Sequence, residues 1–202
     1  MKKVLTVLII INLSVLLFSE TSGKCGFQML KISSGANVAA QGGAGAFSSN
    51  DAFGFLQNPT AGLLSRNNVL SLTQNYWIFD TTINSGAYLN SKGKTSFGFA
   101  YRYLDYGKIP ETNDQGILIG EFHPMDLVLS TNFGYRVTPD HYIGLNINAL
   151  YEKIDTSSSY GFTFDVGYTY LTPFKDLKLS AVLKHLGKTS EMDKEVIDIP
   201  FT

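Results

Sequence analysis

From Val69 onward, apolar and polar side chains alternate along a series of segments, and a period of two fits strands but not helices. The clearest segment is SYGFTFDVGYTYLT, residues 159–172. Aromatic and aliphatic side chains take every second position, and small or polar ones lie between them. Successive side chains of a strand point to opposite faces of a sheet. The pattern therefore predicts strands whose apolar face meets either a protein core or a lipid bilayer.

About seven such segments follow one another, most of them about ten residues long or longer. Tight turns join several of them, and one long polar connection runs from residue 105 to 124. Sandwich strands are usually shorter, about 5 to 6 residues. Membrane barrels use longer strands with alternating lipid-facing and lumen-facing positions. We therefore expect an all-β fold, an antiparallel transmembrane β-barrel, with a secreted sandwich as the alternative.

A basic start and a short apolar run open the chain. Two lysines precede VLTVLIIINLSVLLF, and the small residues that follow offer a cleavage site after Gly23. This arrangement is typical of a secretory signal peptide, so we expect residues 1–23 to be removed on export. The alternatives are a single membrane anchor, for which the run is short, and lipidation of Cys25, whose preceding lysine breaks the usual small-residue pattern.

The remaining chain divides near Val69. Residues 24–68 are rich in glycine and other small residues and have no clear period, whereas residues 69–202 carry the alternating segments. The formal net charge is -1, which provides no basic excess for binding phosphates. We expect no nucleic-acid partner.

Catalytic and cofactor motifs are weak. GGAGAF lacks the full GxGxxG spacing, a preceding apolar strand and a Walker lysine, so packed small residues are the simpler interpretation. His123, His141 and His185 lie in or beside different segments without metal-ligand spacing, and a tyrosine-rich barrel rim accounts for them. No serine with a nucleophile motif accompanies a histidine and an acid. We expect no enzyme activity, cofactor or metal.

Polar side chains of interest lie on the second face of the alternating strands. They belong to four residues that we expect to face a lumen: Arg102, Asn146, Asn148 and Asp165. Simple hydration of these groups in a water-filled lumen is one interpretation. A specific role of Arg102 and Asp165 in binding a ligand is the other.

The segment ISSGANVAAQGGAGAFSSNDAFGFLQNPTAGLL resembles the opening of the PorV/PorQ family, which is itself similar to the long-chain fatty acid transporter barrels. The resemblance rests on a small-residue GGA segment, an acidic residue after a spacer and an NPAGL-like motif. The matching residues are Gly42, Gly43, Asp51, Asn58, Pro59 and Gly62. YRYLDYGKIPETND and residues 144–170 also look like this family. Asn37, where the family often has arginine, and Thr60, inserted in the motif, depart from the pattern.

The resemblance implies a barrel of about fourteen strands with an N-terminal plug, residues 24–68, folded into the lumen. About half of those strands would be present, as if the chain were truncated at its C-terminus. It also implies location in the cell outer membrane, lipid contact, and a role in protein secretion or cell-surface attachment with secretion-system components or secreted proteins as partners. Passage of a hydrophobic small molecule such as a fatty acid is the alternative, and an apolar lumen would favour it.

Overall fold

The main element of the computed structural model is a seven-stranded antiparallel sheet in the order β1-β2-β3-β6-β7-β8-β9. Its strands are β1 (Val69–Tyr76), β2 (Thr82–Lys92), β3 (Thr95–Asp105), β6 (Met125–Arg136), β7 (His141–Ile154), β8 (Ser157–Leu171) and β9 (Lys178–Thr189). The structure describes residues 26–43, 51–65, 68–174, 177–192, 195–196 and 199. The expected signal peptide, residues 1–23, and Cys25 lie outside these ranges. The prediction of an all-β fold is confirmed.

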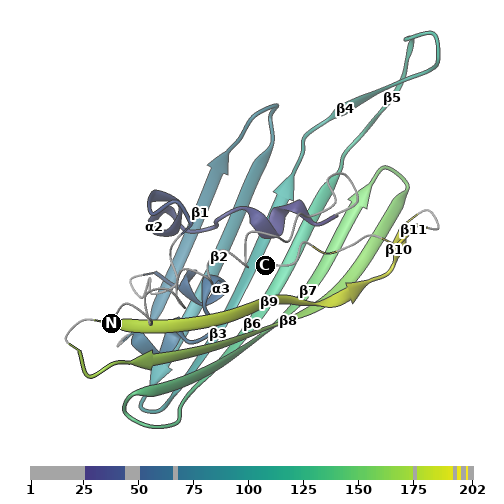
Figure 1. The fold of residues 1–202 in the computed structure, drawn as a ribbon. Helices are drawn as coiled ribbons and strands as arrows, with labels where there is room; N and C mark the ends of the chain where they lie inside the picture. Colours follow the sequence, from purple (N-terminus) through teal and green to yellow (C-terminus); the bar gives the residue numbers. More distant parts are fainter. Residues whose placement is uncertain are drawn as a thin grey trace, which may run out of the picture.

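Each strand of the sheet pairs with its predecessor, except where a hairpin is inserted between β3 and β6. This hairpin consists of β4 (Ile109–Thr112) and β5 (Leu118–Phe122), and it extends beyond one end of the sheet (Figure 1). The expectation of one long polar connection was therefore wrong in part. The segment forms its own strands, and its tip exposes the apolar run Ile117, Leu118 and Ile119.

Tight turns at the opposite end of the sheet follow from local chemistry. Gly93, between β2 and β3, has a φ of +62°, a conformation that glycine adopts without strain. Between β6 and β7, the Thr138 hydroxyl oxygen accepts hydrogen bonds from the backbone N–H groups of Asp140 and His141. These turns bring successive strands back antiparallel with little intervening chain.

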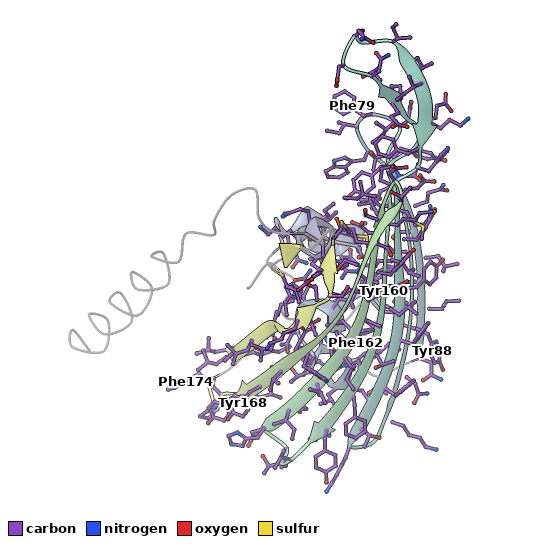
Figure 2. The ribbon with its side chains drawn as sticks, turned by 90° about the vertical axis from the view of Figure 1, so that its right-hand side faces the viewer. Phe79, Tyr88, Tyr160, Phe162, Tyr168 and Phe174 are labelled. Carbon is purple, nitrogen blue, oxygen red and sulfur yellow. The ribbon has the colours of Figure 1, made fainter. Side chains whose placement is uncertain are left out.

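The sheet is open, with β1 and β9 at its edges, so closure into a barrel stays a prediction. Figure 2 shows that its strands bend strongly, which creates a concave and a convex face. A second small ladder, β10 (Glu191–Met192) with β11 (Glu195–Val196), follows β9. Among the described residues, no helix has both the length and the apolar character needed to cross a membrane.

The N-terminal segment, residues 26–43 and 51–65, lies on the concave face (Figure 1). It contains only short helices: η1 (Gln28–Lys31), α2 (Ala36–Ala40), α3 (Gly54–Gln57) and η2 (Ala61–Leu64). Two apolar clusters join it to the sheet. One unites Phe27, Met29 and Leu30 with Ile83, Leu104, Val128 and Leu150. The other unites Ala52, Phe53, Phe55 and Leu56 with Ala87, Leu89 and Ala100.

Outside these clusters, the sheet exposes apolar side chains on one face and buries polar ones on the other, which is the reverse of a water-soluble sheet. On the convex face, Phe162 and Phe164 of β8 are 61% and 45% exposed, and aromatic or aliphatic side chains of the neighbouring strands are exposed beside them (Figure 2). On the concave face, Asn146 is 0% and Asp165 is 2% exposed. The central strands thus expose their apolar side chains and bury many of their polar ones.

Candidate functional site

A buried polar network crosses β6, β7 and β8 at the middle of the concave face. Asn132 Nδ2 donates to Asn146 Oδ1 at 2.7 Å, and Asn146 Nδ2 donates to Asp165 Oδ2 at 3.0 Å. Asn148 Nδ2 reaches the same carboxylate oxygen at 3.0 Å and Thr163 Oγ1 at 3.1 Å. Buried polar groups destabilise a fold unless they are paired, so this chain of amides fixes the side chains of three strands relative to one another.

Asp165 is held by an irregularity in the neighbouring strand. The register of β8 and β9 shifts between Phe164 and Val166, because Lys184 and His185 together oppose one residue, Asp165. This is a β-bulge. His185 has a φ of +59°, and its backbone N–H donates to Asp165 Oδ1 at 2.8 Å. The carboxylate therefore receives hydrogen bonds at both oxygens.

The turn that contains Asn58 and Pro59 connects the N-terminal segment to the opposite side of this network. Asn58 Nδ2 donates to Ser180 Oγ at 2.9 Å and to Thr169 Oγ1 at 3.2 Å. Asn58 Oδ1 accepts from the backbone N–H and the hydroxyl of Thr60 at 3.0 and 2.9 Å. A single side chain thus shapes its own turn and binds two strands of the sheet.

Glycines on the sheet make room for this turn. Gly144 and Gly167 are direct partners in the β7–β8 ladder. A Cβ at Gly144 would overlap the carbonyl of Pro59, and one at Gly167 would lie 2.8 Å from Asn58 Oδ1. The Pro59 carbonyl also accepts a hydrogen bond from Asn132 Nδ2 at 2.9 Å. Only glycine at these two positions leaves room for the backbone of the turn.

Other members of the expected plug motif have local structural roles. Asp51 accepts from the backbone N–H of Phe53 at 2.8 Å and from Asn37 Nδ2 at 3.2 Å, which ties the regions around α2 and α3 together. Gly62 is buried where a Cβ would lie 2.8 Å from Leu89. Asn37 thus contacts the acidic residue of the motif directly.

Gly42 and Gly43 do not fit the expectation of packed small residues. Both are exposed, with φ values of +63° and +85°, and a Cβ on either would meet nothing within 4 Å. They follow α2, and their N–H groups donate to the carbonyls of Ala39 and Val38. They terminate the helix because glycine adopts the left-handed conformation without strain.

Arg102 lines a small cavity under the N-terminal segment. The cavity measures about 10 Å³, and its wall also includes Asp165, Lys184, His185 and Asn148. Arg102 is 7% exposed, and its closest hydrogen bond, from Nη1 to the Met29 carbonyl, is long at 3.5 Å. The four expected lumen-facing residues therefore gather on the concave face, and three of them surround one cavity.

A second polar contact binds the start of the N-terminal segment. Glu152 Oε2 accepts from the backbone N–H of Phe27 at 2.9 Å. A second acid of the sheet, Asp126, accepts through Oδ2 from the Tyr106 hydroxyl at 3.1 Å. Burial, and then the charge of Asp126, raises the pKa of Tyr106 above its ordinary range. Sequence reasoning missed these acids. In the sequence, both acids could have been recognised as charged residues at positions of an alternating strand that face the concave side of the sheet.

Two expectations about these positions need correction. The polar face was expected to meet a water-filled lumen, but the N-terminal segment covers it and the side chains are buried. His185 was assigned to a barrel rim, whereas it is 6% exposed at the bulge. The alternation of β9 breaks at this point, where the pair Lys184 and His185 occupies a single ladder position, and a regular pattern cannot reveal an inserted residue.

An apolar cleft of about 690 Å³ lies at the end of the sheet from which the β4–β5 hairpin extends. Trp77, Ile78 and Phe79 from the β1–β2 turn line it together with Ile109 and Pro110 of β4. Phe79 is 89% exposed, and Figure 2 places it beside the hairpin. Aromatic and aliphatic side chains form most of its lining.

Comparison with known protein families gave no match for this chain, and comparison with curated proteins gave none at a significant level.

Proposed function

We propose that this chain forms part of the wall and the internal plug of a cell outer-membrane β-barrel of PorV/PorQ type, serving protein secretion or cell-surface attachment. One observation carries the membrane assignment. The convex face exposes aromatic and aliphatic side chains over several adjacent strands, while the concave face buries amides and charges. A water-soluble sheet has the opposite distribution, and lipid-facing strands of a membrane barrel have this one.

The covered concave face supports a secretion-linked role over conduction. Asn58 and Pro59 are bonded into the wall through Thr169, Ser180 and Asn132, so the N-terminal segment is part of the fold rather than a loose gate. Within the described residues, the N-terminal segment is packed against the concave face through two apolar clusters and through these hydrogen bonds. The exposed loops and the β4–β5 hairpin then provide the surfaces on which the protein would receive or release secreted proteins.

The apolar cleft lined by Trp77, Ile78 and Phe79 favours the second candidate, passage of a hydrophobic small molecule such as a fatty acid. Its exposed aromatic lining would accept an acyl chain. Leu104 of its lining belongs to the apolar cluster around Phe27, Met29 and Leu30, and Ile32 and Tyr106 pack against that cluster. The inner side of the cleft therefore borders a packed apolar cluster.

A deletion strain separates the two candidates. The strain is complemented with the wild-type gene or with Trp77→Ser, which removes an aromatic side chain from the cleft lining. Both surface-exposed secreted proteins and oleate uptake are measured. We expect deletion to reduce secreted proteins at the surface, with oleate uptake unchanged, and Trp77→Ser to restore secretion. Loss of oleate uptake on deletion, with normal secretion, would establish the transport candidate instead. Recovery of the protein from the soluble fraction would contradict both.

A further inference from the structure

We propose that the cavity beneath the N-terminal segment binds a small monovalent anion, of which chloride is the representative, between Arg102 of β3 and Lys184 of β9. The inference goes beyond the proposed function and does not depend on it. It requires only that the N-terminal segment lies on the concave face, whether that face belongs to a membrane barrel or to another assembly.

Unused donors on Arg102 are the first argument. A guanidinium group carries five N–H donors, and burying them without partners is unfavourable. Nε of Arg102 has no hydrogen-bond partner among the described residues, and the Nη1 bond to Met29 O is at the 3.5 Å limit. The side chain is more than nine-tenths buried and lines the cavity. A buried residue of the cavity lining thus has an unpaired N–H donor, which an acceptor bound in the cavity would satisfy.

Lys184 adds a second cation from the other side of the cavity. The bulge places it beside His185, and within the described residues its ammonium group makes no hydrogen bond or ion pair. Asp165 is the acid in the lining, and its two oxygens already accept from Asn146, Asn148 and the His185 backbone. Two cations and one anion leave one excess positive charge, which a monovalent anion would balance.

The size of the cavity selects the ligand. A volume of about 10 Å³ corresponds to roughly one water-sized particle. Leu30, Val38 and Phe53 of the N-terminal segment form the apolar part of the lining. Chloride is larger than water, so its binding requires the flexible Lys184 side chain to shift while its ammonium group stays in contact with the ion. A carboxylate with an attached chain, a sulfate or a phosphate would have to displace the N-terminal segment.

The bound anion would tie the N-terminal segment to the wall. Arg102 contacts this segment through Met29, and Lys184 belongs to the strand whose Ser180 binds Asn58. An anion shared by both cations would therefore link strands at opposite sides of the curved sheet beneath the same segment. Loss of the anion would leave two like charges facing one cavity. It would weaken the contact between the N-terminal segment and the sheet.

The direct test is a crystal of the full-length protein grown in sodium bromide, examined for anomalous scattering. We expect one bromide peak within about 3.5 Å of both Arg102 and Lys184 nitrogens. A water molecule at that position, with no anomalous signal in bromide, would overturn the proposal. This experiment needs no substitution, so it does not depend on whether a variant folds.

Thermal stability in detergent gives the solution test, at constant ionic strength with chloride replaced stepwise by gluconate. We expect the wild-type Tm to rise by about 2–4 °C with chloride and to saturate. Lys184→Met and Arg102→Gln should lose this dependence, whereas Lys188→Met, on the exposed end of the same strand, should keep it. Equal chloride dependence in Lys184→Met and wild type, or none in wild type, would show that no anion binds there.

Discussion

Phe164 and Asp165 are neighbours in β8, but they lie in opposite environments. Phe164 is 45% exposed on the convex face, and Asp165 is 2% exposed beneath the N-terminal segment. In a water-soluble sheet the aromatic side chain would be buried and the carboxylate exposed. Alternation shows that the two faces of the sheet have different surroundings, but it does not identify the surroundings of either face. Here the N-terminal segment covers the concave face, and this identifies the concave face as the buried one.

Phe164→Arg should have the largest effect. Phe164 lies at the middle of β8, and arginine near the bilayer midplane of a barrel destabilises by roughly 2–4 kcal/mol. The loss should be measured on the full-length protein as folding into phosphatidylcholine vesicles, followed by gel mobility with and without heating. Phe174→Arg, in the β8–β9 turn and 72% exposed, is the matched control and should cost about 0–1 kcal/mol. Equal tolerance of both substitutions would mean that the convex face does not meet lipid.

Asp165→Asn should be the next most damaging change. An amide has only one acceptor oxygen, and its NH₂ would face the N–H donors of Asn146, Asn148 or His185. Loss of hydrogen bonds to a charged group costs about 1.5–3 kcal/mol. Urea unfolding of the vesicle-bound protein gives the measurement. Asp155→Asn, in the exposed turn between β7 and β8, is the control that should leave the midpoint unchanged. An unchanged midpoint for Asp165→Asn would mean that Asp165 is hydrated and not held by these hydrogen bonds.

Gly144→Ala should act on the N-terminal segment more than on the sheet. The new methyl group would overlap the Pro59 carbonyl, and overpacking of this kind costs about 1–3 kcal/mol. We expect a cysteine introduced at Ala61, which is buried in wild type, to become reactive toward a bulky maleimide in this background. Ala149→Val, on the convex side of the same strand, should leave that cysteine shielded. Shielding in both backgrounds would mean that the turn at Pro59 moves without opening the segment.

Alternation predicted the seven strands of the main sheet, though not β4 and β5, and it placed Arg102, Asn146, Asn148 and Asp165 on the polar face of their strands. These succeed because a period of two is a local property of extended chain. It also predicted correctly that the apolar side chains of residues 159–172 share one face. The sequence analysis also offered a hydrated Asp165, whereas its carboxylate is buried and accepts three hydrogen bonds.

The contacts that cover the polar face could not be predicted in this way. Asn58 meets Thr169 and Ser180 across more than a hundred residues of sequence, and no period encodes such a pairing. The bulge at His185 inserts one residue, which a regular pattern hides. A clue was present in Gly144 and Gly167, because glycines inside long strands indicate close approach of another backbone.

The smallest effect, and the finest test of the two faces, comes from adjacent residues of β6. Thr131 lies on the convex face, where its hydroxyl has only a 3.5 Å hydrogen bond to the Ile147 carbonyl. Thr131→Val should shift the urea midpoint by no more than about 0.5 kcal/mol, toward stability in vesicles, because it removes a polar group from an apolar surface. Asn132→Leu, one residue further and buried, should lose about 1–3 kcal/mol because Pro59 O and Asn146 Oδ1 lose their donor. If Thr131→Val proved as harmful as Asn132→Leu, the convex face would carry polar contacts of its own, and its contact with lipid would have to be abandoned.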